Sequence, residues 1–169
     1  MSQVYTPVDW ASIKVFTRYD FQWPDRLDHS VVKRLDTLDI YLPVKPQIIS
    51  DYRPPEPGST SQHHLGRAID FIVPGVDSLE VLAAIKKCGL FSVYGMYTNE
   101  KGVESFHVDT RTTRTTHNPA TWGAWKDASA GVTSWQYVDL ANIVAKISKG
   151  AGFVVLLIVG VALYVLISK

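Results

Sequence analysis

The stretch SQHHLGRAIDF, residues 61–71, sets a histidine and an aspartate seven residues apart across a glycine and leads into an apolar run. His63 and Asp70 carry side chains that bind zinc, and a catalytic zinc site uses three protein ligands and leaves the fourth position to water. The downstream stretch VESFHVD, residues 103–109, supplies His107 as the third ligand and Glu104 as a general base. These two stretches predict a zinc site with a base beside it.

The order of these motifs resembles the zinc D-Ala-D-Ala peptidase family. The pattern S-x-H-x-x-G-x-A-x-D occupies residues 61–70 and E-x-x-H occupies residues 104–107. SDYRPPE at residues 50–56, and HVDTR at 107–111 followed by Trp122-Gly123, are similar to the family's other segments. The family includes D-Ala-D-Ala carboxypeptidases and dipeptidases and the L-alanyl-D-glutamate endopeptidases of phage lysins, and its fold is related to hedgehog signalling domains. The resemblance covers about residues 16–125.

The resemblance implies a Zn²⁺ cofactor and a peptidoglycan stem or cross-link peptide as substrate. Arg53, with its planar donor fork, polarises the scissile carbonyl or grips a substrate carboxylate in this interpretation. Glu104 takes the proton of the attacking water and passes it to the leaving amine. The remaining candidates are Tyr52 and Ser61 at the substrate and Asp109, which either orients a zinc ligand or pairs with Arg111.

A single histidine or aspartate is more often a hydrogen-bonded structural residue than a metal ligand. The ordered combination of His63, Asp70, Glu104 and His107 is what favours zinc here. His64, adjacent to His63, is expected to face solvent or to make a supporting hydrogen bond.

The chain has 169 residues, 46% hydrophobic content and a net charge of +1, which predicts one globular domain and argues against nucleic-acid binding. Cys88 is the only cysteine, so an intramolecular disulfide is excluded.

The pattern of apolar and turn residues predicts an α+β fold, in which a small antiparallel sheet carries the zinc ligands and packs against two or more helices. Apolar periodicity predicts helices at 28–39 and from Asp77 to Gly89. Strands are expected at 47–50, 68–73, 90–97 and 103–110, and a loop at 54–61. We expect an irregular N-terminal arm at 1–15 and the zinc peptidase domain at 16–127.

The C-terminal part is predicted to lie at a membrane. Residues 151–168 carry no charge, and at about 1.5 Å per residue they are long enough for one helix across a hydrocarbon core of about 30 Å. We therefore expect a single-pass transmembrane helix at 150–169. Residues 128–149, with Trp135 and Tyr137, form a linker or interfacial helix in this interpretation, although a packed domain helix fits equally well. The glycines give no dimerisation motif, so the oligomeric state stays open.

The flanking lysines weakly favour a cytoplasmic domain, whereas peptidoglycan lies on the other side of a bacterial membrane. A phage lysis enzyme at the bacterial inner membrane, or an entry enzyme of a virion membrane, resolves this conflict. The short loop between Arg53 and His63, shorter than in many relatives, favours an endopeptidase over a D-Ala-D-Ala carboxypeptidase. The alternatives are a non-catalytic zinc-binding or peptidoglycan-binding module and a purely structural virion protein, but neither has a need for Glu104.

Overall fold

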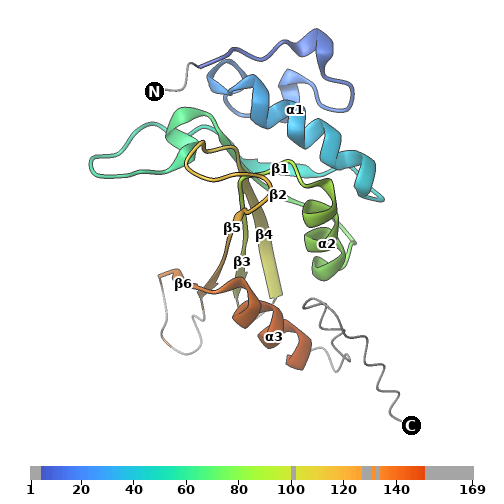
Figure 1. Ribbon diagram of the computed structural model, residues 1–169, viewed down its shortest axis with the longest axis vertical. Helices are drawn as coiled ribbons and strands as arrows, with labels where there is room; N and C mark the ends of the chain where they lie inside the picture. Colours follow the sequence, from blue (N-terminus) through green and yellow to red (C-terminus); the bar gives the residue numbers. More distant parts are fainter. Residues whose placement is uncertain (1–4, 100–101, 127–130, 132–133, 151–169) are drawn as a thin grey trace.

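A computed structural model describes residues 5–99, 102–126, 131 and 134–150, which form a mixed α+β fold. Its sheet has six strands in the order β1-β2-β4-β3-β5-β6. The strands are β1 (Gln47–Ser50), β2 (Ala68–Ile72), β3 (Val93–Asn99), β4 (Gly102–Asp109), β5 (Ala120–Lys126) and β6 (Gln136–Val138). The α-helices in the described part are α1 (His29–Leu38), α2 (Ser78–Cys88) and α3 (Leu140–Gly150), which contribute residues to one hydrophobic core (Figure 1).

The two predicted helices are confirmed, and their ends follow from their capping residues. Asp28 begins α1, because its carboxylate accepts a hydrogen bond from the Ser30 amide at 3.0 Å. Asp77 begins α2 in the same way through the Leu79 amide at 2.8 Å. Gly89 ends α2 in the left-handed conformation, with φ of 65°.

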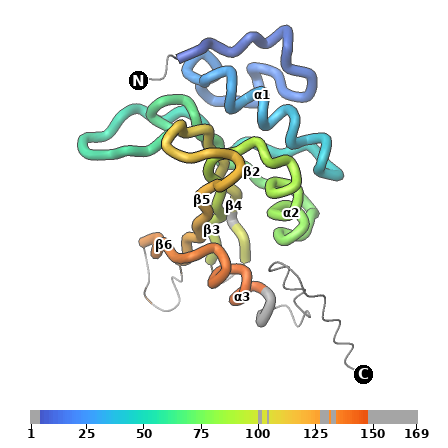
Figure 2. Tube along the Cα trace, viewed as in Figure 1, coloured from blue at the N-terminus to red at the C-terminus, as the bar shows by residue number. Residues whose placement is uncertain are grey.

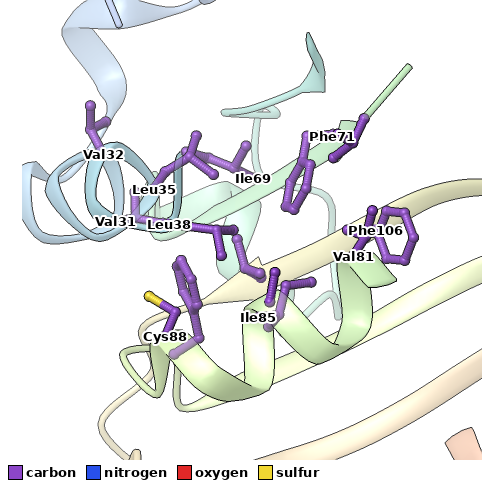
Figure 3. Close-up of a cluster of buried hydrophobic side chains, with 14 of the residues drawn as sticks. Val31, Val32, Leu35, Leu38, Ile69, Phe71, Val81, Ile85, Cys88 and Phe106 are labelled. Atoms are coloured by element: carbon purple, nitrogen blue, oxygen red, sulfur yellow. The ribbon is translucent and has the colours of Figure 1, made fainter. Parts of the chain in front are cut away.

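The hydrophobic core lies between one face of the sheet and these two helices (Figure 3). Side chains alternate between the two faces of a strand, so every second residue of the central strands enters this core. The core residues that meet there are Val31, Leu35 and Leu38 of α1, Val81 and Ile85 of α2, and Ile69, Phe71, Phe106 and Val108 of the sheet. The residues between them on β2 and β4 face the opposite side.

The predicted antiparallel sheet is found only in part, because β3 and β5 run parallel. Asp109 at the end of β4 and Ala120 at the start of β5 both pair with Val93 at the start of β3. The loop 110–119 therefore crosses over the N-terminal end of β3, and β5 begins on the other side of that strand. β5 itself was missed from the sequence, because its apolar residues are interrupted by Gly123 and do not alternate cleanly.

The segment after residue 127 contributes to the fold. β6 pairs with β5, and α3 packs against β5 through Ile143, which is fully buried. A Cβ atom at Gly123 would lie 2.2 Å from Ile143 Cγ1, so glycine allows the helix to approach the strand. Of the alternatives that the sequence left open, the packed domain helix is the one observed for α3.

In the described part of the chain, no helix is both long and apolar enough to cross a membrane. The apolar residues 151–168 of the predicted transmembrane helix lie outside the described residues.

The N-terminal arm is irregular but attached to the domain. Its described residues contain one 3₁₀ turn, Trp10–Ser12, and Ile13 is buried in the core. The Asp36 carboxylate of α1 accepts hydrogen bonds from the amides of Lys14 and Val15 at 3.0 and 2.7 Å. The arm therefore packs as part of the globular domain, although the domain was predicted to begin only at residue 16.

Candidate metal centre

His63 lies on a 3₁₀ turn, η5 (Gln62–Leu65), immediately before β2. The Ser61 hydroxyl begins this turn by accepting a hydrogen bond from the His63 amide at 3.3 Å. Gly66 ends it with φ of 66°, and a Cβ atom there would lie 1.9 Å from the Arg26 carbonyl oxygen. The predicted bend at Gly66 is confirmed, and it brings His63 to the face of β2 that carries Asp70.

Asp70 on β2 and His107 on β4 are direct partners in the antiparallel ladder. Residues opposite each other on neighbouring strands point to the same face of the sheet. Their neighbours Ile69, Phe71 and Phe106 face the core, so Asp70 and His107 face away from it. The hydrophobic pattern that builds the core therefore also fixes the position of two candidate ligands.

The three predicted ligands converge. Asp70 Oδ1 lies 3.2 Å from His63 Nε2 and 2.7 Å from His107 Nδ1. One ligand atom from each residue falls within 4.8 Å of the others, and all three side chains are buried. This is a compact set of two imidazoles and one carboxylate.

The imidazole nitrogens that face away from this cluster are already engaged. His63 Nδ1 hydrogen-bonds to the backbone carbonyl oxygen of Asp51. His107 Nε2 lies 3.4 Å from Asp109 Oδ2, and Arg111 Nε donates to the same carboxylate oxygen at 3.0 Å. Such partners fix ring orientation and tautomer in metal sites. They leave His63 Nε2 and His107 Nδ1 directed at Asp70, where the three residues could hold an ion, and Asp109 contacts both of its predicted partners.

The electrostatics of the cluster suit charged carboxylates. Burial opposes ionisation of Asp70, but hydrogen bonds from His107 and His63 outweigh it and hold the Asp70 pKa well below its usual range. Burial likewise opposes charge on His107, but hydrogen bonds to Asp109 and Asp70 raise its pKa. The Asp109 pKa is lowered despite burial, because His107 and Arg111 donate to the carboxylate.

The chemistry of this donor set fits a catalytic metal. Two histidines and one carboxylate match catalytic zinc sites, which keep one position open. The same donor types also hold non-haem iron(II). The donor set therefore fits zinc but does not by itself choose between these metals.

Of the predicted substrate residues, Arg53 borders the cluster on the β1 side, whereas the described contacts of Tyr52 lie elsewhere. The Arg53 side chain is 50% exposed, and its Nη2 lies 3.5 Å from Asp70 Oδ2. Tyr52 packs edge-on against Trp23, with ring centroids 6.2 Å apart, and Arg26 lies over its ring. His64 hydrogen-bonds to the Arg53 carbonyl oxygen at 2.9 Å, which is the supporting role given as one of the two expectations for this residue.

Glu104 lies on β4, and its side chain is outside the described part of the structure. The ladder between β3 and β4 is irregular at this point: Tyr97 pairs with Ser105, and Thr98 pairs with Val103. Glu104 is therefore an extra residue, a β-bulge, on its strand.

The sequence singled out Trp122 only as part of the Trp122-Gly123 segment that resembles the peptidase family, and the contacts on the β5 side of the cluster were not predicted. The Trp122 ring lies beside His107, with centroids 5.3 Å apart, and packs against Tyr97 at 5.0 Å. These two aromatic side chains come from strands whose pairing is not local. The backbone carbonyl of Asp51 was also missed, because a main-chain hydrogen bond leaves no mark on the residue type.

In comparisons with known proteins, the chain matched no family model, no curated protein and no solved structure. Its relation to the peptidase family therefore rests on motif resemblance, and its function has to be argued from the site.

Proposed function

We propose that this protein is a zinc-dependent peptidase that hydrolyses peptide bonds of bacterial peptidoglycan. The observation that carries the proposal is the convergence of His63 Nε2, Asp70 Oδ1 and His107 Nδ1, with both outer imidazole nitrogens held by other groups. A group of buried polar side chains arranged in this way has the donors of a zinc site with an open position. The motif resemblance supplies the substrate class.

The three ligands would hold zinc, which polarises a carbonyl as a Lewis acid and lowers the pKa of a water to about 7. The protein's part is to keep the ligands in position. Asp51 fixes the His63 ring through its carbonyl, and Asp109 fixes the His107 ring through its carboxylate. Arg111 keeps the Asp109 carboxylate charged, so that this carboxylate accepts a hydrogen bond from the His107 ring.

Arg53 is the proposed substrate-binding cation. It lies at the edge of the cluster and is half-exposed, so its guanidinium can contact a substrate while staying next to Asp70. A planar donor fork binds a carboxylate or a developing oxyanion through two hydrogen bonds.

Glu104 is the proposed general base. On a regular strand, residues three apart face opposite sides, which would separate Glu104 from His107. The bulge removes this objection, because Val103 and Phe106 are also three apart and both pack against the core. The two side chains of an E-x-x-H motif on a strand share a face only if the alternation of side chains shifts by one residue. The bulge gives such a shift between residues 103 and 106.

The loop between Arg53 and His63 supports endopeptidase action. Residues 54–60 are exposed throughout and project away from α2 as a loop (Figure 2), so they are not packed beneath other parts of the domain. An open site accepts a chain that continues on both sides of the scissile bond. We further propose that residues 151–168 anchor the enzyme in a virion or bacterial inner membrane, for cell lysis or entry.

The test is release of wall peptides by the full-length chain in a mild detergent. Purified sacculi are incubated with zinc-loaded protein, chelator-treated protein and the Glu104→Gln variant, and the products are identified by mass spectrometry. Glu80→Gln is the matched control, because Glu80 is exposed on α2, across the sheet from the ligands. Release that requires metal and Glu104, and survives Glu80→Gln, supports the proposal.

Elemental analysis of the purified protein distinguishes zinc from iron. Folded, zinc-loaded protein that releases nothing from sacculi of several wall types would contradict the peptidase and leave the non-catalytic binding module.

A further inference from the structure

The side of the metal cluster opposite Arg53 is formed by aromatic rings. Trp122 of β5 lies beside His107, and two tyrosines border its ring: Tyr97 of β3 at 5.0 Å and Tyr137 of β6 at 5.5 Å between centroids. We call Trp122, Tyr97 and Tyr137 the aromatic platform.

The Trp122 ring lies flat on the sheet because residue 95 is glycine. A Cβ atom at Gly95 would fall 2.4 Å from Cδ2 and 2.5 Å from Cε2 of Trp122. These two atoms form the bond shared by the two rings of the indole, so only an approach through the ring face reaches both. One face of Trp122 therefore rests on the Gly95 backbone, and the other face points away from the sheet.

The aromatic platform is partly open to solvent. Trp122 is only partly buried, and Tyr137 on the last strand is 65% exposed. The sequence suggested Tyr137 for a membrane boundary, but pairing of Ala124 with Tyr137 puts this ring on the same face as Trp122. β6 thus brings a residue from beyond position 127 to the candidate site.

We propose that the aromatic platform binds a sugar ring of the glycan strand next to the scissile peptide bond. A pyranose ring has an apolar face of C–H groups and a rim of hydroxyls. The platform has the complementary pattern: a flat indole face, with tyrosine hydroxyls at its border. This inference rests on the proposed function, and it adds the orientation of the substrate.

The charge distribution across the cluster supports that orientation. Following the strand order, Arg53 lies on the β1 side of the ligands and Trp122 on the β5 side. Peptidoglycan has the same polarity, because its sugars are largely neutral and its stem peptides carry carboxylates. The glycan end would lie on Trp122, and the carboxylate-bearing end would reach Arg53.

The short distance from Trp122 to His107 limits which bond is cut. Their ring centroids are 5.3 Å apart, and an extended peptide covers about 3.3–3.6 Å per residue. A sugar on the platform leaves room for about one or two residues before the metal ligands. The cleaved bond should therefore be among the first bonds of the stem, close to the glycan.

The direct test uses glycan strands from which the stem peptides have been removed enzymatically. They are added to the zinc-loaded, full-length Glu104→Gln variant in detergent, and the indole N–H resonances are followed by NMR. The Trp122 resonance, identified by its loss in Trp122→Phe, should shift on titration. Trp10, which packs against Phe21 at the N-terminal arm, is an internal control and should not shift.

The variants Trp122→Phe and Tyr137→Ala should each weaken glycan binding by roughly five- to tenfold, since aromatic contacts of this kind are modest. Trp125→Phe is the matched control, because Trp125 lies on the same strand but contacts Lys146 of α3 on the other face. Tyr137→Ala keeps the test valid if Trp122→Phe folds poorly, since Tyr137 is mostly exposed.

The outcomes separate this inference from the proposed function. If wall peptides are released but glycan strands leave the Trp122 resonance unmoved, the sugar assignment is wrong and the peptidase stands. The same holds if free stem peptide, and not glycan, shifts that resonance. If glycan binds through Trp122 but no bond is cut, the sugar site stands and the peptidase is wrong.

Discussion

Replacing Gly66 with alanine tests whether the turn between His63 and Asp70 is held in place by its backbone. Gly66 has φ of 66°, and its carbonyl oxygen accepts a hydrogen bond from the Asp28 amide at 2.9 Å. An alanine Cβ atom would lie 1.9 Å from the Arg26 carbonyl oxygen, a distance that backbone atoms cannot tolerate. The turn or the segment at Arg26 must therefore move.

The loss of stability has three sources. A non-glycine residue in the left-handed region costs about 1–2 kcal/mol. Forcing an extra carbon into a packed region adds about 1–3 kcal/mol, and weakening one hydrogen bond adds about 1 kcal/mol. We expect Gly66→Ala to lower the free energy of unfolding by about 3–6 kcal/mol, a large share of the roughly 5–15 kcal/mol of a typical domain.

Gly58→Ala is the matched control. Gly58 also has a left-handed φ, of 77°, but nothing lies within 4 Å of its Cβ position. It should lose only the conformational cost of about 1–2 kcal/mol. Urea unfolding of both variants, followed by circular dichroism with and without zinc, measures the difference. Equal losses in the two variants would refute the claim that contact with Arg26 fixes the turn.

Three other changes test the site and the C-terminal part. Asp109→Asn should weaken zinc binding about 10–100-fold, measured by competition with a chelating dye, because the His107 ring loses its charged partner; unchanged affinity would exclude this role. Metal-free protein should be most stable between about pH 4 and 6.5. The lowered pKa of Asp70 stabilises the folded protein, and this stability is lost as the pH falls below the ordinary carboxyl pKa of 3.8. The raised pKa of His107 gives stability that is present below the ordinary histidine pKa of 6.5 and is lost as the pH rises. Zinc should move the urea midpoint optimum to higher pH, since ligands bind deprotonated, and an optimum that does not move would contradict this. Gly123→Ala should destabilise the protein by about 1–3 kcal/mol through contact with Ile143, and adding Ile143→Ala should not add its full separate cost if the two residues touch.

The parts of the fold that were predictable are those set by local chemistry. The helices predicted at 28–39 and from Asp77 to Gly89 agree with α1 and α2 to within a residue or two. The strands beside them have short apolar runs bounded by turn residues. β5 lacks such a run because the residue that contacts α3 is Gly123, which has no apolar side chain. β6 lacks one because all of its residues are exposed.

The candidate ligands were predictable because their residue types carry the chemistry. The position of His63, in a turn before β2 and ahead of Gly66, follows from the odd spacing between His63 and Asp70 and was expected. The aromatic platform was not, because the contact of Trp122 with Tyr97 and Tyr137 depends on a parallel pairing and a crossover that no local pattern encodes. Long-range pairing is the information that sequence periodicity lacks.

Asp51 is one of the residues that connect the N-terminal segment to the candidate metal centre. Asp51 accepts hydrogen bonds from the amides of Gln22 and Trp23 through its carboxylate, at 2.6 and 3.2 Å, and it holds His63 through its own carbonyl. Burial raises the Asp51 pKa, although those amides stabilise its charge. Because the carboxylate and the carbonyl belong to one residue, a shift of the N-terminal segment would be transmitted to the His63 ring. The arrangement of the ligands thus depends on Gln22 and Trp23 of the N-terminal segment as well as on the sheet.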